Sequence, residues 1–245
     1  MRFKQFYEWY HRDRKLPKRV ITSKNFTYRI IISVLDKFCK SKEVLDIGSG
    51  VGTVDFYLAN KGKRVIGIEI SEKAFKVANK SLKLFNLEGN VKFYRTDFFN
   101  FKSNKRYEFL ICSEVLEHLK DDKLALEKIY ELTKKNGLLM LTVPSKNAPL
   151  TKFGVIENFD ERSGHLRRYT LDELRSFLKE NKFKVIFSKK SEGILRNSLF
   201  VFKWGSPITR IANRFSVVSD TITFFDNILL NIFGESQLIV VAKKI

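Results

Sequence analysis

Residues 44–52 read VLDIGSGVG, an apolar stretch followed by three glycines that alternate with other residues. An apolar run predicts a buried strand, and glycines directly after it predict a tight turn into a helix, because glycine adopts backbone angles that other residues avoid. The missing side chains also let a ligand lie against the main chain. The stretch therefore predicts a ligand site at the turn after the first strand of an α/β fold.

A second apolar run, residues 64–69, ends in Glu69. An acidic residue about 20 positions after a glycine turn is where nucleotide-binding α/β folds hold a ribose diol. The pair predicts a cofactor that contains a nucleoside. Nicotinamide-dependent oxidoreductases bind such a cofactor, but Thr53 and Val54 depart from their G-x-G-x-x-G fingerprint.

From residue 43 onward the chain alternates strand and helix patterns. This alternation predicts an α/β fold with a Rossmann-like, doubly wound, seven-stranded and mostly parallel sheet that binds ligands beyond the carboxyl ends of its strands. The long segment 144–164 is expected to be a loop. The expected strands are 43–47, 64–69, 91–95, 107–112, 137–143, 184–188 and an antiparallel last strand at 238–242, and the expected helices are 53–61, 72–85, 121–134 and 170–181.

Two segments flank this core. Aromatic residues at helical spacing predict an amphipathic helix over residues 1–12, and an apolar stripe from Phe26 to Phe38 predicts a second helix. The aromatic and irregularly apolar segment before the last strand predicts a helical insertion. We therefore expect a single domain over residues 1–245, divided into a helical cap (1–42), a cofactor-binding core (43–190), an insertion (191–235) and the last strand (236–245).

The composition is basic. The 245 residues carry a formal net charge of +19, and residues 1–44 hold twelve Lys or Arg against four Asp or Glu. Such a field attracts the phosphates of nucleic acid or the headgroups of anionic lipid, and a lysine-rich, solvated surface is the alternative explanation. An apolar content of 44% is enough for a sizeable core.

Cysteine use and hydropathy point to a cytoplasmic protein. Cys39 and Cys112 lie in apolar surroundings without metal-ligand spacing, so we expect buried, reduced thiols and neither zinc nor disulfides. No segment has the pattern of a secretion signal or an apolar run of about 18 residues that would span a bilayer.

The chain resembles the class I S-adenosylmethionine-dependent methyltransferases over residues 43 to about 190 and the last strand. The first motif of that family reads here as residues 45–52, and its acidic residue at the end of strand two is Glu69. The acidic landmark after strand three is Asp97-Phe98. The landmark after strand four reads CSEVLEHL at residues 112–119 and resembles the small-molecule branch related to ubiquinone-type O-methyltransferases.

The resemblance implies S-adenosylmethionine as the cofactor, S-adenosylhomocysteine as its product, and a role for each matching position. Gly48 and Gly50 would lie against the amino-acid part, with Asp46 reaching its ammonium. Glu69 would accept the ribose hydroxyls. The rest of the implied pocket is Asp97 at the adenine amino group, the Phe98 backbone N–H at a ring nitrogen, Ile70 as an apolar wall, and Ser49, Gly52, Ser113 and Glu114.

Methyl transfer is an in-line displacement, so the protein aligns the reactants and excludes water, and a general base is needed when the acceptor is a hydroxyl. His165 lies in the loop after strand five, where this family builds its acceptor site, and we expect it to be the base or to orient the acceptor. His118 is the second candidate and is expected to share a helix face with Glu114. Arg167 and Arg168 are candidates for an acceptor phosphate or carboxylate.

The expected reaction is O-methylation of a hydrophobic, lipid-linked or sugar-type small molecule, at the inner membrane surface if the insertion lies in a lipid interface. The insertion interleaves Phe and Trp with Arg and Lys, which suits a membrane interface, single-stranded nucleic acid, or a lid or dimer face. Two other functions stay open. One is methylation of nucleic acid or protein, although the Asn/Asp-Pro-Pro-Tyr type motif is missing, and the other is a non-catalytic membrane-associated protein.

Overall fold

The computed structural model describes residue 8 and residues 16–245. Apart from Glu8, the helix predicted over residues 1–12 lies outside the described residues. The apolar stripe that begins at Phe26 forms α2 (Arg29–Phe38), as predicted.

The described residues form a seven-stranded sheet with the order β3-β2-β1-β4-β5-β7-β6. Neighbouring strands are parallel except β7, which runs antiparallel to β5 and β6. The predicted fold class is therefore confirmed, including the antiparallel last strand. The strands are β1 (Glu43–Ile47), β2 (Arg64–Glu69), β3 (Val91–Arg95), β4 (Tyr107–Ser113), β5 (Thr133–Pro144), β6 (Phe183–Ser191) and β7 (Gln237–Lys244).

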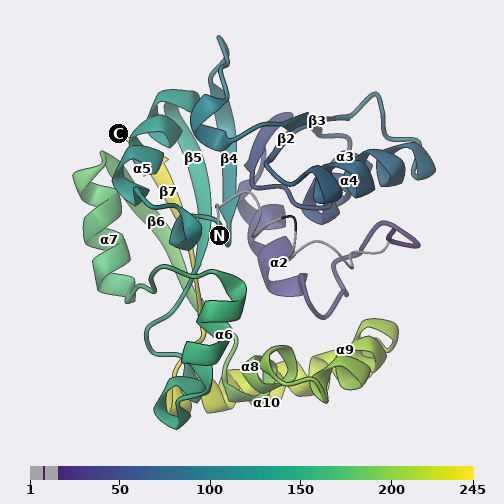
Figure 1. Cartoon of the computed structure of the whole chain (residues 1–245), viewed down its shortest axis with the longest axis vertical. Helices are drawn as coiled ribbons and strands as arrows, with labels where there is room; N and C mark the ends of the chain where they lie inside the picture. The colour runs from purple at the N-terminus through teal and green to yellow at the C-terminus, as the bar shows by residue number, and fades with distance from the viewer. Residues whose placement is uncertain (1–7, 9–15) are drawn as a thin grey trace.

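Helices cover both faces of the sheet, as Figure 1 shows. On one face α2, α3 and α4 bury an apolar layer with β-strand residues such as Val44 and Ile111, and on the other face α5 and α7 do the same with residues such as Leu45 and Leu110. Adjacent strand residues point to opposite faces, which is why neighbours in sequence enter different cores. The helices are α3 (Thr53–Asn60), α4 (Glu72–Leu84), α5 (Asp122–Leu132) and α7 (Leu171–Glu180).

Capping side chains set where two of these helices begin. The Ser71 hydroxyl accepts the Ala74 backbone N–H at the start of α4, and the Glu8 carboxylate accepts the N–H of Lys73 at 3.2 Å at the same terminus. Thr170 and Glu173 form a reciprocal capping box at the start of α7. Each cap satisfies backbone donors that the helix cannot pair internally.

The insertion before the last strand is helical, as predicted. It consists of α8 (Ile194–Val201), α9 (Gly205–Arg214) and α10 (Ser216–Phe233), which run along the bottom of the molecule in Figure 1. The Arg196 guanidinium is buried and lies 4.2 Å from the centre of the Phe26 ring, and its Nη2 donates to the Phe26 carbonyl at 2.9 Å. This contact ties the insertion to the segment that precedes α2.

The structure corrects three sequence predictions. Residues 144–164 are not one loop, because η3 (Pro149–Phe153) and α6 (Val155–Ser163) lie within them. The helix predicted to reach residue 134 ends at Leu132. The strand predicted over 137–143 begins earlier, at Thr133, and contains Asn136 with a φ of 63°, where the pairing with β4 shifts register between Tyr107 and Phe109. A bulge of this kind absorbs extra residues without ending a strand.

Cys39 and Cys112 are buried free cysteines, as predicted. Among the described residues no helix has the length and apolarity needed to cross a membrane.

Candidate active site

A cavity of about 470 Å³ lies at the carboxyl ends of the central strands. A volume of this size is typical of small-molecule sites, and this edge of the sheet is where open α/β folds bind ligands. The wall combines the predicted cofactor residues with residues of the insertion. Among the lining residues are Asp46, Gly48, Ser49, Gly50, Glu69, Ile70, Asp97, Phe98, Ser113, Glu114, His118, His165, Arg168, Glu192 and Asn197.

The glycine turn has the conformation that its sequence predicts. Gly48, Gly50 and Gly52 all have positive φ, at 75°, 57° and 80°. A Cβ atom on Gly50 would meet nothing within 4 Å, so the main chain there faces open space. Gly52 serves packing instead, because a Cβ atom there would lie 2.6 Å from the Phe93 ring; Gly52 does not line the cavity.

The Glu69 side chain connects the glycine turn after β1 to the turn after β2. Its Oε2 accepts the backbone N–H of Gly50 at 2.8 Å, and its Oε1 accepts the N–H of Ser71 at 2.6 Å. The side chain is buried yet lines the cavity. Burial raises the pKa of Glu69, while these backbone donors act in the opposite direction. The carboxylate is thus held in one orientation, with lone pairs left for hydroxyl groups of a ligand.

Buried acids gather at this end of the cavity. Burial raises the pKa of Asp46 well above its usual value, and the nearby carboxylates of Asp55 and Glu69 raise it further. Burial also raises the pKa of Asp55, to about 7. In addition, the buried Ser49 hydroxyl has no hydrogen-bond partner among the described residues. A cationic ligand would stabilise the buried carboxylates, and its hydrogen-bonding groups could satisfy the Ser49 hydroxyl. S-adenosylmethionine, with its sulfonium and ammonium groups, fits that description.

Asp97 and Phe98 lie beyond the end of β3. The Asp97 Oδ1 accepts the Phe99 N–H at 2.8 Å and so caps η1 (Phe98–Asn100). Both residues line the cavity, together with Ile70 at the end of β2. The structure therefore brings the predicted adenine-side residues to the same cavity as the glycine turn.

Ser113 and Glu114 end β4 beside β5. The Thr142 hydroxyl donates to Glu114 Oε1 at 2.8 Å, and Gln237 Nε2 donates to the same oxygen at 3.2 Å. The prediction that Glu114 shares a helix face with His118 is wrong. Glu114 has a φ of 54°, and only a short turn, η2 (Leu116–His118), follows it. The left-handed backbone at Glu114 is incompatible with a right-handed α-helix, so Glu114 cannot share a helix face with His118.

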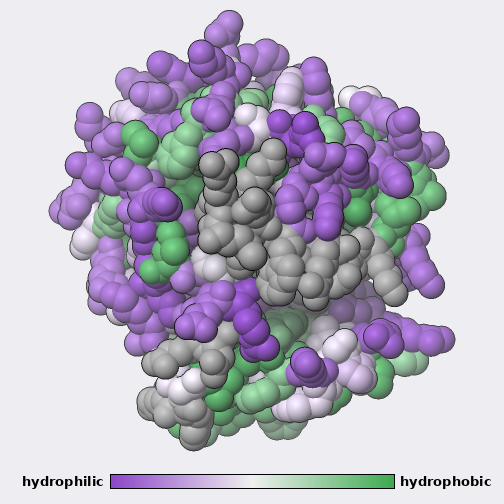
Figure 2. Space-filling model, in the orientation of Figure 1, coloured by the Kyte–Doolittle hydropathy of each residue, from purple (hydrophilic) through white to green (hydrophobic). Residues whose placement is uncertain are grey.

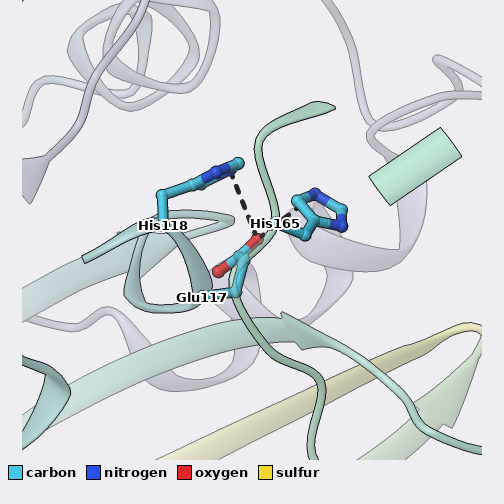
Figure 3. A group of neighbouring side chains, drawn as sticks. All are labelled: Glu117, His118 and His165. Atoms are coloured by element: carbon cyan, nitrogen blue, oxygen red, sulfur yellow. Dashed lines mark ion pairs between the residues drawn. The ribbon is translucent and has the colours of Figure 1, made fainter. Parts of the chain in front are cut away.

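The two histidines and Glu117 form one cluster, which Figure 3 shows with Glu117 between the two rings. The ring centres of His118 and His165 are 4.9 Å apart. Glu117 Oε1 lies 3.7 Å from His118 Nε2 and 4.0 Å from His165 Nε2. Neither oxygen of the fully buried Glu117 carboxyl has a hydrogen-bond partner among the described residues, and burial raises its pKa well above the usual value.

The ligand atoms of this cluster lie within 4.8 Å of one another, and carboxylate and imidazole are donors that divalent transition metals accept. Each of the two rings is oriented by a hydrogen bond to a group outside this cluster. His118 Nδ1 lies 3.0 Å from the Gly164 carbonyl, which can only accept, so Nδ1 carries the proton. Burial lowers the pKa of His118 to about 4, so this ring is neutral at pH 7.

His165 is oriented by a pair of charged residues on the same side of the cavity. Its Nδ1 lies 2.7 Å from Asp160 Oδ1, and Arg168 Nε donates to Asp160 Oδ2 at 2.6 Å. Burial works against ionisation of Asp160, but hydrogen bonds from His165 and Arg168 hold its pKa below the usual value. Asp160 is therefore an acceptor, and His165 Nδ1 donates to it. The opposite ring nitrogen, Nε2, is left as a proton acceptor.

The structure separates the two arginines that were candidates for acceptor binding. Arg168 lines the cavity, but its guanidinium is engaged by Asp160 and by the Ser145 carbonyl at 3.1 Å. Arg167 is outside the lining residues that the structure describes, and it pairs with Asp122 at 2.7 Å. An acceptor phosphate would have to displace these partners, so we assign acceptor binding to neither arginine.

The insertion supplies the remaining wall of the cavity. Glu192, at the end of β6, and Asn197, on α8, both line it, and the Asn197 Oδ1 has no hydrogen-bond partner among the described residues. Glu192 has a φ of 59°, and its carboxylate lies 3.9 Å from the Arg196 guanidinium. Burial raises the pKa of Glu192 to about 7.

The raised pKa of Glu192 makes stability depend on pH with a known sign. Its pKa is about 7 in the folded chain against 4.5 for the ordinary group, so the folded state binds more protons between these values. The ionised carboxylate therefore destabilises the fold above pH 7, and this effect vanishes below pH 4.5. Glu192→Gln is expected to raise the free energy of unfolding by about 3 kcal/mol at pH 8 and to lose this advantage toward pH 4.5.

Urea unfolding of wild type and Glu192→Gln at pH 8, 6 and 5 measures this difference. Glu180→Gln, which changes an exposed residue of α7, is the matched control and is expected to show no pH-dependent gain. An advantage of equal size at pH 8 and pH 5 would mean that the gain comes from packing and not from titration.

Sequence reasoning missed four residues of this site: Glu117, Asp160, Glu192 and Asn197. Glu117 belongs to the motif at residues 112–119, but its position in that motif did not show whether its side chain lies in a cavity or in the core. Asp160 lies on α6, where only a loop was expected. Glu192 and Asn197 reach the cavity because the chain turns from β6 into α8. No local sequence pattern predicts the direction of that turn.

Comparison with known proteins agrees with the fold and the cavity. The methyltransferase domain family matches residues 11–187. An S-adenosylhomocysteine complex of magnesium protoporphyrin IX methyltransferase from Synechocystis PCC 6803 superimposes with a TM-score of 0.64 at 18% identity, over 98% of this chain and 94% of that one. The chain therefore belongs to the methyltransferase domain family, as a class I S-adenosylmethionine-dependent methyltransferase.

The curated relatives cover only part of the chain. A ubiquinone biosynthesis O-methyltransferase from Nitrosospira multiformis is 34% identical over 119 residues, which is 47% of this chain and 48% of that protein. A 23S rRNA (uracil(747)-C(5))-methyltransferase from Pyrococcus abyssi is 32% identical over 105 residues, which is 43% of this chain and 25% of that protein. The matched part thus spans half or less of each relative. The predicted family and cofactor are confirmed, and the role of each site residue stays a prediction.

Proposed function

We propose that this chain transfers a methyl group from S-adenosylmethionine to a hydroxyl group of a small-molecule acceptor, which binds at the His118–His165 end of the cavity. The observation that carries this proposal is the ordered set Arg168, Asp160 and His165. It places an oriented imidazole in the wall of the same cavity that the glycine turn and Glu69 line.

When bound, S-adenosylmethionine supplies a methyl group made electrophilic by its sulfonium. An aliphatic hydroxyl keeps its proton at neutral pH, so the protein has to accept that proton. His165 is suited to this because its Nδ1–H donates to Asp160 at 2.7 Å, so Nε2 is the nitrogen through which the neutral ring accepts a proton. The Asp160 carboxylate would also stabilise the imidazolium that results, as the acid does in hydrolase triads.

The cofactor side of the cavity would be held by this chain's own groups. Glu69 would accept two hydroxyls, Asp46 would face the cationic amino-acid part, and the main chain at Gly50 would allow close approach. Helix α8 of the insertion adds Asn197, Phe200 and Val201 to the wall and would help to keep water away from the reacting atoms.

The walls indicate the acceptor class. Ile156, Phe200 and Val201 give the acceptor end an apolar surface, while Asn197 and Gln237 offer hydrogen-bonding groups. An acceptor with an apolar body and one or more hydroxyls suits this combination, because the polar groups fix its orientation and the apolar wall binds its body. A lipid-linked or quinone-type molecule has this chemistry, and the ubiquinone relative's name supports that class.

Incubation with labelled S-adenosylmethionine and separate extracts of lipid, RNA and protein tests the proposal. Label is expected in the lipid or small-molecule fraction, in a product that resists mild alkali, because a methyl ether survives conditions that cleave a methyl ester. Excess S-adenosylhomocysteine should abolish the labelling. Label found in RNA alone would contradict a small-molecule acceptor, and an alkali-labile product would contradict methylation of a hydroxyl.

Methylation of RNA is the second candidate function. The net charge of +19 is the observation that favours it, since a basic surface binds phosphates strongly. Salt dependence separates the two candidates: turnover of an RNA acceptor should fall steeply between low and moderate salt, whereas turnover of an uncharged hydroxyl acceptor should change little.

A further inference from the structure

The helical insertion exposes an unusual apolar surface on the side away from the sheet. Figure 2 shows hydrophobic side chains gathered at the bottom of the molecule, where α8, α9 and α10 lie in Figure 1. On α10, Phe224 is 62% exposed and Ile232 is 69% exposed. Side chains of this size do not normally face water in a group.

Five of the six large apolar residues of α10 that are exposed form one stripe, and Phe233 lies outside it. Val217, Phe224, Phe225, Ile228 and Ile232 fall within a sector about 100° wide at the helical repeat, along about 22 Å of helix. Asn227 and Asn231 border the stripe on one side. The opposite side of the helix is anchored: the buried Asp226 accepts the backbone N–H groups of Gly193 and Arg196. The orientation of the stripe is therefore fixed by buried contacts.

Helix α9 and two residues that flank it, Lys203 and Phe215, add both apolar and cationic side chains. Ile208, Ile211 and Phe215 are exposed at helical spacing, and Lys203, Arg210 and Arg214 are exposed beside them. None of these three cations forms an ion pair with a described residue. The Arg214 guanidinium lies 5.5 Å from the centre of the Phe215 ring, at the boundary between polar and apolar groups. We refer to the exposed residues of these two helices together as the α9–α10 face.

We propose that the α9–α10 face docks onto a bilayer that carries anionic lipid headgroups. Amphipathic helices with bulky apolar residues on one side and Lys or Arg at the boundary lie in the plane of such an interface. The charges of the face agree with this partner. The exposed cations on and beside α9 form no ion pair with a described residue, so they are available to lipid phosphates. The single exposed acid of α10, Asp220, is paired with Arg29.

The same observations disfavour two other occupants. In a symmetric dimer through this face, the cations of one copy would approach those of the other, on chains that each carry +19. Nucleic acid would need a row of aromatic rings for base stacking, but the centre of the α10 stripe is branched aliphatic, with Val217, Ile228 and Ile232.

Docking in this orientation would bring the acceptor end of the cavity close to the lipid. Helix α8 lines the cavity with Asn197 and packs against α9 and α10, so the insertion contacts the cavity on one side and the solvent on the other. The inference stands apart from the proposed reaction, because binding to vesicles is measured without cofactor or acceptor.

Cosedimentation of the full chain with vesicles tests the proposal. Binding is expected to vesicles of phosphatidylcholine mixed with phosphatidylglycerol and to be much weaker with phosphatidylcholine alone. The double variant Arg210→Glu/Arg214→Glu should bind the mixed vesicles at least about thirtyfold more weakly, since each cation contributes to attraction at an anionic surface. Phe224→Ser/Ile228→Ser should weaken binding at least about tenfold on both kinds of vesicle.

Matched controls keep the result interpretable. Lys80→Glu/Lys83→Glu makes the same charge change on α4, and Leu84→Ser removes an exposed apolar side chain there. Both are expected to bind like wild type. Calorimetry with S-adenosylhomocysteine confirms that each variant is folded. The proposal would be overturned if the α4 controls lost as much vesicle binding as the variants of the face, or if wild type did not bind mixed vesicles. It would also be overturned by a dimer in ultracentrifugation that Phe224→Ser/Ile228→Ser dissociates, or by tighter binding to single-stranded RNA than to vesicles.

Discussion

His165→Ala is expected to lower the rate of methyl transfer by about a hundredfold to ten-thousandfold, the usual contribution of a positioned general base. The loss should appear in kcat, with little change in the dissociation constant for S-adenosylhomocysteine, because His165 lies at the acceptor end of the cavity and contacts Asp160 rather than the glycine turn. Single-turnover kinetics with the acceptor found by labelling measures this effect.

Asp160→Asn is the informative companion variant. An amide in that position can donate to His165 Nδ1 and so favour the wrong tautomer, which should lower kcat while leaving the ring in place. Full turnover of His165→Ala with intact cofactor binding would make the base assignment wrong. So would loss of wild-type turnover on chelation followed by recovery with a divalent cation, because Glu117, His118 and His165 would then act as ligands.

Glu69→Ala is expected to weaken binding of S-adenosylhomocysteine about a hundredfold. The variant removes a carboxylate that can accept two hydroxyls, and hydrogen bonds to a charged acceptor are worth about 1.5–3 kcal/mol each. It also frees the backbone N–H groups of Gly50 and Ser71, which the carboxylate now accepts at 2.8 and 2.6 Å. Calorimetric titration measures the dissociation constant.

Glu69→Gln separates the two effects of that substitution. The amide keeps one acceptor oxygen for the turn, so its affinity should fall between those of wild type and Glu69→Ala. Glu72→Gln is the control, because it removes an acid three residues away that lies outside the lining residues and pairs with Lys76 and Arg95. Unchanged binding in Glu69→Ala, with the fold intact by urea unfolding, would contradict the cofactor role of Glu69.

The cofactor end of the site could be predicted from the sequence because its residues are local to strand ends. Gly48, Gly50 and Glu69 follow β1 and β2 directly, and parallel strands bring their carboxyl ends to one edge. Each of these signals needs only a strand, a turn and a fixed spacing. The acceptor end contains residues from η2, α6 and α8, which come together only when the long connections after β5 and β6 fold back.

The histidine cluster illustrates that limit. His165 and His118 were both identified as candidates, but as separate ones, and Glu117 and Asp160 were not identified. Their contacts join η2 to the end of α6, across 47 residues of chain. Residue type indicates that a histidine can act as a base, but only its partners decide which ring nitrogen is free and whether burial lowers its pKa.

The sequence by itself determined the sheet, the glycine turn and the class of cofactor, because strand periodicity and glycine backbone freedom are local properties. Other features became visible only in the folded chain. Segment 144–164 contains a helix that carries Asp160, and this acid binds Arg168. Helix α10 exposes one apolar side to solvent, while Asp226 anchors its other side. These features depend on which groups lose contact with water when distant segments pack, and no local spacing encodes that.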